Sequence, residues 1–219
     1  MKQLRVVTAL AAVCLLGVSA VAWAANINGT NGPDFLPGTS QNDRIRSFGG
    51  NDIIYGLGGS DRIEASSGDD RVNGDGTCRA GAPDPDYCED DETKGGNDRI
   101  SAGSGDDTVQ GGRGNDTIRG NDGDDDLDGE SGNDRVSGYD GDDDVKGGTG
   151  NDRLSGGDGN DTISGGSGND RIFARDGERD VIKCGPGFDR VYADAIDSVA
   201  SDCERVTRGR KAVRGRFVG

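Results

Sequence analysis

Aspartate recurs at nine-residue intervals through most of this 219-residue chain. Its carboxylates are hard oxygen donors, and their regular spacing predicts a series of metal ligands. General acid–base chemistry instead requires two carboxyl groups in unlike surroundings, which a regular series does not provide. The predicted metal ligands each stand two residues before an isoleucine, valine or leucine: Asp43, Asp52, Asp61, Asp70, Asp98, Asp107, Asp116, Asp125, Asp134, Asp143, Asp152, Asp161 and Asp170.

Glycine-rich stretches precede these aspartates, most clearly in residues 156–161 (GGDGND) and 165–170 (GGSGND). Glycine accepts positive φ angles without steric cost, so each stretch predicts a tight turn. The three residues around each apolar position suffice for a very short strand with the apolar side chain inward. One turn and one strand take nine residues, so a full coil takes eighteen. Alternate apolar residues then stack in opposite sheets: Ile100, Ile118, Val136, Leu154 and Ile172 in one, and Val109, Leu127, Val145 and Ile163 in the other.

Such a polymer is not expected to fold without a cation. Stacked coils place carboxylates about 5 Å apart, and each pair repels by about 1 kcal/mol in water or about 3 kcal/mol at an effective dielectric of 20. A dication between successive coils removes this repulsion, with carboxylates and glycine carbonyls as its ligands. Ca²⁺ accepts about six to eight such oxygens in flexible geometry, whereas Mg²⁺ requires a strict octahedron. The sequence therefore predicts several calcium ions.

The nonapeptide G-G-x-G-x-D-x-U-x, with U a large apolar residue, resembles the repeat of the RTX (repeats-in-toxin) family. The resemblance covers roughly residues 27–191 and is most specific between 98 and 172. It implies an all-β fold, a parallel β-roll that forms a calcium-bound right-handed solenoid of short strands. In RTX toxins and proteases the repeats follow a large effector domain. None precedes them here, so toxin or protease activity is not expected.

Residues 1–24 have the pattern of a secretory signal peptide. Lys2 and Arg5 give a charged start, an apolar run follows, and residues 22–24 (AWA) offer small residues around a cleavage site. A membrane anchor is the alternative, although the run is short and contains Gly17 and Ser19. We therefore expect a secreted, extracellular protein that does not insert into a membrane once the signal is removed.

The composition is strongly acidic, with a formal net charge of −16 and 41 glycines. Without Lys2 and Arg5, 23 basic residues face 41 acidic ones, a net charge of −18. High charge with low hydrophobicity ordinarily indicates disorder, and only the regular repeat argues against it here. A negative surface argues against nucleic acid and anionic lipid as partners.

The nine-residue period is interrupted between Val72 and Ile100. We expect repeats at residues 25–72, an inserted loop at 73–94 and the main repeats at 95–191. The loop contains Cys78 and Cys88, for which local disulfide pairing is expected in an oxidising compartment. A thiolate metal site would need closer cysteine pairs and usually histidine, which the chain lacks. A structural loop is the main interpretation, and a partner-binding loop is the alternative.

The repeats end in a segment with more apolar residues and no glycine turn. We expect residues 192–206 to cap the solenoid, held by a disulfide between Cys184 and Cys203. Residues 207–219 form a basic tail, either solvated or in contact with an anionic envelope polymer. Looser turns in the first repeats, such as residues 65–70 (ASSGDD), predict weaker calcium sites there.

Arginine occupies many of the positions between the aspartate and the apolar residue. One interpretation is a basic stripe for an acidic ligand. The other is that these outward side chains offset nearby carboxylates, since Thr108, Thr117, Asp126 and Asp144 share the column. The arginines in question are Arg44, Arg62, Arg71, Arg99, Arg135, Arg153 and Arg171.

Taken together, these patterns predict a secreted calcium-binding repeat protein with no catalytic centre and a structural or surface role. Glycans or cell-envelope polymers are the expected partners besides calcium. One rival is a polysaccharide lyase or epimerase on a parallel β-helix, but such folds have longer, irregular coils with a larger aromatic core. The other is a calcium-dependent adhesin or matrix component, which differs only in its partner.

Overall fold

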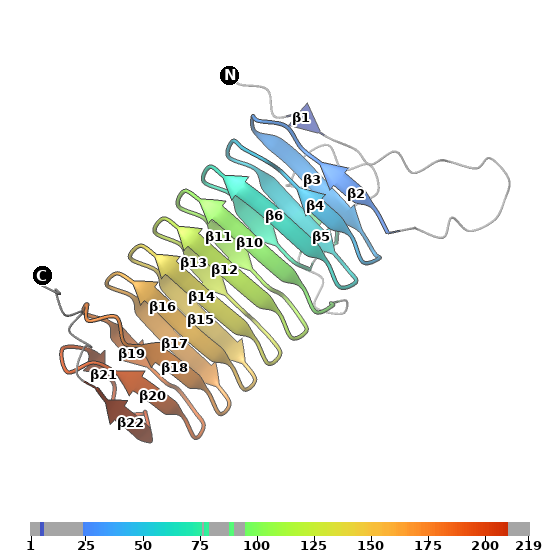
Figure 1. The fold of residues 1–219 in the computed structure, drawn as a ribbon. Coiled ribbons are helices and arrows are strands. Elements are labelled where there is room, and N and C mark those ends of the chain that lie inside the picture. The colour runs from blue at the N-terminus through green and yellow to red at the C-terminus, as the bar shows by residue number, and fades with distance from the viewer. Residues whose placement is uncertain (1–4, 7–23, 76, 79–87, 90–94, 210–219) are drawn as a thin grey trace, which may run out of the picture.

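The protein forms an elongated coil of parallel strands in two sheets that lie back to back (Figure 1). The structure is a computed structural model that describes residues 5–6, 24–75, 77–78, 88–89 and 95–209. Within these residues there is no helix, and each of the two sheets contains ten strands. The predicted all-β parallel solenoid is therefore confirmed. None of the described segments is a helix that could cross a membrane.

The first sheet begins with a two-residue strand inside the expected signal segment, where Arg5 pairs with Asp34. Each later coil contributes one strand to this sheet. In spatial order the first sheet contains β1 (Arg5–Val6), β3 (Asp34–Thr39), β5 (Ile53–Leu57), β7 (Arg71–Asn73), β11 (Thr108–Gln110), β13 (Asp126–Asp128), β15 (Asp144–Thr149), β17 (Thr162–Ser167), β19 (Val181–Lys183) and β21 (Ser198–Val199).

The second sheet contains the other strand of each coil. In spatial order it contains β2 (Asn26–Asn28), β4 (Arg44–Arg46), β6 (Arg62–Ser67), β10 (Arg99–Ser104), β12 (Thr117–Asp122), β14 (Arg135–Asp140), β16 (Arg153–Asp158), β18 (Arg171–Ala174), β20 (Arg190–Ala193) and β22 (Arg205–Arg208).

The apolar column forms the core between the sheets. Ile118 lies opposite Val136 in the second sheet, and Leu127 lies opposite Val145 in the first, so each residue stacks on the one eighteen positions away. All four side chains are buried. The predicted division of alternate apolar residues between opposite sheets is confirmed.

Several strands in both sheets are longer than the predicted three residues. β12 and β14 each have six, because the chain turns at a residue of positive φ and then pairs again with the next coil. Asn121 (φ 85°) and Tyr139 (φ 91°) are these turning residues, and they lie opposite one another. The sequence did not reveal this second pairing, since neither residue is the glycine that such a conformation favours.

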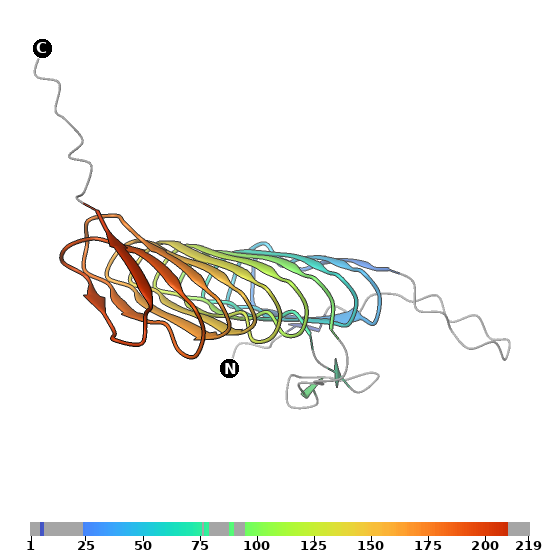
Figure 2. The ribbon, with the colours of Figure 1, turned by 90° about the horizontal axis from the view of Figure 1, so that it is seen from below.

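The solenoid continues directly across the interruption in the repeat. β6 pairs with β10 and β7 with β11, so Ile63 meets Ile100 and Val72 meets Val109. A separate antiparallel pair, β8 (Thr77–Cys78) and β9 (Cys88–Glu89), stands away from the coil (Figure 2). Its backbone register sets Cys78 opposite Cys88. Their side chains lie outside the described residues, and the disulfide between them stays a prediction.

The C-terminal end contains the second expected disulfide, Cys184–Cys203, with its sulfur atoms 2.04 Å apart. The segment expected to cap the solenoid continues both sheets, through β21 in the first and β22 in the second. β22 reaches Arg208, so the first residues assigned to the basic tail also belong to the second sheet.

Candidate metal centres

The thirteen predicted ligands lie along the two edges where the chain passes from one sheet to the other. Each is buried, and none exposes more than 4% of its surface. Their positions follow from the sequence: each aspartate directly precedes a strand, and its apolar neighbour two residues later points into the core. The coil separates the aspartates into two ladders, one next to each sheet.

One oxygen of each carboxylate is bound by the preceding coil. The backbone N–H of Asp116 donates to Oδ1 of Asp134 at 2.8 Å, and that of Asp134 donates to Oδ1 of Asp152 at 2.8 Å. In the other ladder the N–H of Asp125 donates to Oδ1 of Asp143 at 2.9 Å. The ladders therefore align the carboxylates along the solenoid axis and fix their orientation.

The second oxygen has no such partner. In twelve of the thirteen aspartates, all except Asp43, Oδ2 is buried and accepts no hydrogen bond. A buried charged oxygen without a partner is strongly unfavourable, and native proteins rarely leave one. A row of them indicates that a cation belongs beside each coil.

Glycine makes room for these oxygens. A Cβ on Gly129, five residues before Asp134, would lie 2.7 Å from Oδ2 of Asp134 and 2.7 Å from the carbonyl oxygen of Gly147. The same arrangement occurs one coil earlier, where a Cβ on Gly111 would meet Asp116 and the carbonyl of Gly129. Carboxylate and carbonyl oxygens from successive coils thus converge, and this donor set suits Ca²⁺.

Burial also sets the protonation of the carboxylates when no cation is bound. The pKa of Asp61, Asp98 and Asp134 is raised to about 8, and burial is the largest cause. The N–H bond from the preceding coil lowers these pKa values, and neighbouring carboxylates raise them. Protons therefore occupy part of the ladder at neutral pH and compete with a metal ion.

Asp43 differs from the other predicted ligands. The N–H of Ala25 donates to its Oδ1 at 2.6 Å, and the N–H of Thr39 donates to its Oδ2 at 2.5 Å. Both oxygens are thus satisfied by the protein. Asp43 therefore has no unpaired buried oxygen that requires a cation, in contrast to the twelve later aspartates.

The set of candidate ligands extends further than the sequence indicated. Asp180 and Asp189 are fully buried and also leave Oδ2 unpaired. Their spacing before Ile182 and Val191 was the available signal. Asp176 had none, because it stands at the single extra residue that interrupts the period.

That extra residue brings three carboxylates together. Oxygens of Asp161, Asp176 and Asp180 all lie within 4.8 Å of one another, and the described residues contain no other such group of three. The extra residue lengthens the step between coils, so the N–H of Asp161 reaches Asp180, nineteen positions away, at 3.0 Å. Burial and, to a smaller extent, the charge of Asp176 raise the pKa of Asp180 to about 7.

Comparison with known proteins agrees with this geometry. No relative among curated proteins matches the chain. The family model of the RTX calcium-binding nonapeptide repeat matches residues 28–63, 47–76, 92–126, 101–136, 119–154, 137–172 and 146–179. These matches include more than half of the chain and all thirteen predicted ligands. The protein belongs to the RTX calcium-binding nonapeptide repeat family.

Proposed function

We propose that this is a secreted structural protein whose solenoid folds when several Ca²⁺ ions fill the two aspartate ladders. The observation that carries the proposal is the row of buried, unpaired Oδ2 atoms, which recurs from Asp52 to Asp189. Each of these oxygens accepts no hydrogen bond and is free to bind a metal ion. The glycine carbonyl oxygens beside it complete an all-oxygen ligand set. The repeats contribute calcium binding, and the rigid surface they build contacts glycans or envelope polymers.

Secretion is proposed from the leader at residues 1–24 and from cysteines suited to oxidation, including the Cys184–Cys203 bridge. A role without catalysis is proposed because most of the aspartates repeat one arrangement, with Oδ1 bound by the preceding coil and Oδ2 buried without a partner. Acid–base chemistry needs carboxyl groups whose pKa values are set apart by unlike environments. We also propose that the mature chain does not insert into a membrane and does not bind nucleic acid.

Circular dichroism of the mature chain tests calcium-dependent folding. The metal-free protein is expected to lack most of its β signal and to gain it cooperatively as calcium is added, because metal binding and folding share one free energy. Magnesium is expected to substitute poorly, since it requires a strict octahedron. A spectrum that stays unchanged through the calcium titration would refute the proposal.

A further inference from the structure

The arginines of the repeat are concentrated on one face of the solenoid. Eight of the ten strands of the second sheet have arginine at the same register position, which in every one of them except β22 directly precedes a buried core residue. These eight residues form what we call the arginine row. On the strands from β5 to β21 in the first sheet, only Arg71 stands at that position, and Asp126 and Asp144 replace arginine there. The arginine row consists of Arg44, Arg62, Arg99, Arg135, Arg153, Arg171, Arg190 and Arg205.

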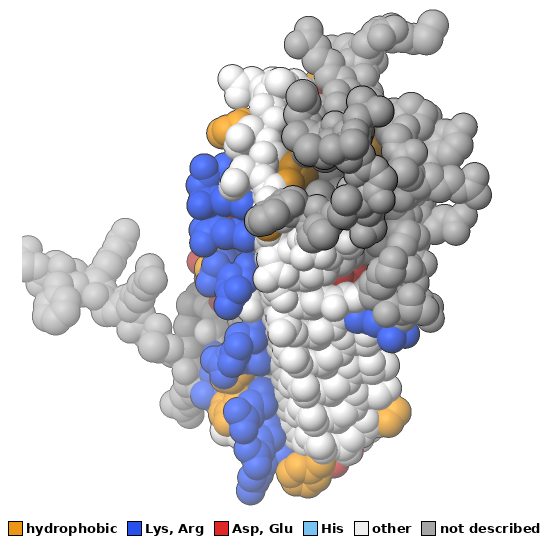
Figure 3. Space-filling model, turned by 90° about the vertical axis from the view of Figure 1, so that its right-hand side faces the viewer, with side chains coloured by type: hydrophobic (Ala, Val, Ile, Leu, Met, Phe, Trp, Pro, Cys, Tyr) orange, Lys and Arg blue, Asp and Glu red, His pale blue; other side chains and the backbone are white. Residues whose placement is uncertain are grey.

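The row runs along the solenoid axis with one interruption, at Thr117 between Arg99 and Arg135, and is unbroken from Arg135 to Arg205. Arg135 lies opposite Arg153, Arg153 opposite Arg171, and the register continues through Arg190 to Arg205. Figure 3 shows the resulting stripe of basic side chains along the length of the molecule. Neighbouring strands are about 4.8 Å apart, so the backbone positions of five successive arginines, from Arg135 to Arg205, repeat at that spacing.

Most of the row has no internal counterion. Arg44 and Arg62 pair with Glu64 at 3.4 and 2.9 Å. From Arg99 onward, no arginine of the row has a carboxylate oxygen within 4.0 Å in the described part of the chain. Adjacent like charges at this spacing repel. The aspartates that share this column in the sequence, Asp126 and Asp144, lie on the other sheet, so they do not offset the row.

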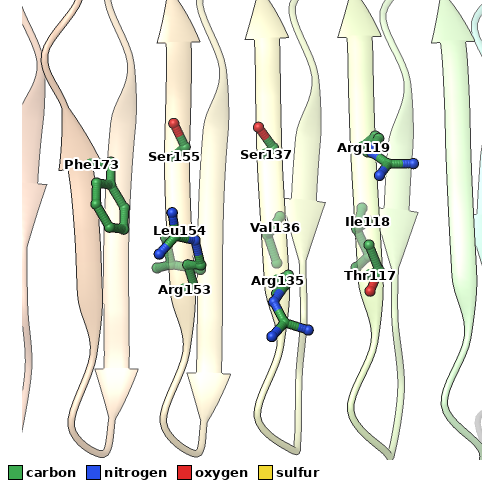
Figure 4. A pocket seen from close by; sticks show the side chains of 10 residues that line it. All are labelled: Thr117, Ile118, Arg119, Arg135, Val136, Ser137, Arg153, Leu154, Ser155 and Phe173. Atoms are coloured by element: carbon green, nitrogen blue, oxygen red, sulfur yellow. The ribbon is translucent and has the colours of Figure 1, made fainter.

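A groove of about 410 Å³ follows the row between β12 and β18. Figure 4 shows Arg135 and Arg153 side by side along it, with Ser137 and Ser155 on the same strands. The guanidinium carbon of Arg153 lies 4.1 Å from the centre of the Phe173 ring. A guanidinium stacked on an aromatic ring keeps its in-plane N–H groups free for a carboxylate and loses less entropy when it binds.

We propose that this face of the second sheet binds an extended acidic polysaccharide that carries carboxylates on successive sugars. Arginine matches a carboxylate through two parallel hydrogen bonds, and a linked sugar advances by about one strand spacing. The serine hydroxyls beside the arginines suit sugar hydroxyl groups. The inference rests on the proposed function, because only the folded solenoid aligns the row.

A second copy of this chain is the main competing occupant, with its acidic first sheet facing the row. That sheet is less suitable, because Asp126 and Asp144 already pair with Lys146 at 2.8 and 3.2 Å. A nucleic acid is disfavoured because the groove offers hydroxyl groups and no ring face free for a base: Arg153 lies over one face of Phe173, which also stacks with Tyr192 at 5.0 Å.

The test is calorimetric titration of the mature protein in calcium with galacturonate oligomers too short to gel, at fixed ionic strength. The decisive variant replaces Arg135, Arg153 and Arg171 with threonine, the residue that the chain itself has at the aligned position 117. We expect its dissociation constant to rise at least about tenfold, since each change removes charge-assisted hydrogen bonds. The matched control replaces Arg71, Lys146 and Lys183 on the first sheet, removes the same charge, and is expected to bind as the wild type does.

Three results would overturn the inference: no binding by wild type, equal losses in the two variants, or tighter binding of single-stranded DNA than of the oligomer. A salt-sensitive dimer in light scattering, abolished by the arginine variant, would assign the face to a second copy instead. Circular dichroism of the same samples separates the two proposals. A wild type that gains β structure in calcium but binds no glycan refutes only this inference, whereas one that fails to fold refutes the proposed function.

Discussion

Replacement of Asp143 separates a metal ligand from a structural hydrogen-bond acceptor. Its Oδ1 accepts the N–H of Asp125 at 2.9 Å, and its Oδ2 is buried without a partner. Asp143→Ala removes both oxygens. Asp143→Asn can keep the acceptor for Asp125 but replaces the charged oxygen with a neutral amide. If Asp143 serves only as an acceptor, the asparagine variant will behave like wild type.

The structure gives the expected size of each effect. In the alanine variant, loss of the acceptor leaves a buried N–H unpaired, which costs about 1–3 kcal/mol, and loss of the charged ligand adds to this. Since about 1.4 kcal/mol is a factor of ten, we expect the calcium midpoint of Asp143→Ala to rise about tenfold or more. Asp143→Asn is expected to show a clearly raised midpoint too, because the charge at Oδ2 is lost.

Asp140 provides the matched control within the same turn. It is exposed and lies in register with Asp122 and Asp158 on the neighbouring strands, so it faces like charges and no core. Asp140→Ala should change stability by less than about 0.5 kcal/mol. Calorimetric titration with calcium measures midpoint and stoichiometry for all three variants. Equal behaviour of Asp143→Ala and Asp140→Ala would show that the aspartate ladder is not the ligand set.

Three further predictions concern pH, the inserted loop and the extra residue. Burial raises the pKa of Asp98 to about 8 from an ordinary 3.8, so the metal-free fold binds more protons than the unfolded chain. The stability of the metal-free fold should therefore be greatest below about pH 4 and fall as the pH rises through 8, whereas calcium affinity should rise over the same range. Circular dichroism at about pH 5 and 8, without calcium and during a calcium titration, checks both trends. Non-reducing peptide mapping should pair Cys78 with Cys88, and any cross-link from these to the C-terminal cysteines contradicts a separate loop. Asp176→Asn should weaken calcium binding at the junction with Asp180 and leave the remaining sites unchanged, so a uniform loss at all sites in the titration argues against a local role.

Much of the architecture could be predicted because the repeat couples two periods. Nine residues fix the turn and its aspartate, and eighteen fix which sheet receives each core residue, as Ile118 and Leu127 show. Features set by three-dimensional contact could not be predicted in this way. The satisfied oxygens of Asp43 depend on Ala25 and Thr39, whose backbone N–H groups carry no signal in the sequence.

Asp176 illustrates a different limit. A repeat pattern identifies ligands by their position in the period, and an extra residue has no such position. Its carboxylate becomes informative only once the coil places it beside Asp161 and Asp180. Departures from a repeat are therefore sites where structure adds most to the sequence, because the period that predicts the neighbours does not apply to them.

The arginine column shows how the choice of period changes an interpretation. At a period of nine, arginine alternates with threonine and aspartate, and the mixture suggests charges that compensate one another. At a period of eighteen, the coil sends Arg135 and Arg153 to one face and Asp126 and Asp144 to the other. The same residues then define one basic face and one partly acidic face. In a two-sheet solenoid a surface property must be judged over a full coil, since compensation between strands of opposite sheets acts across the core and not along a face.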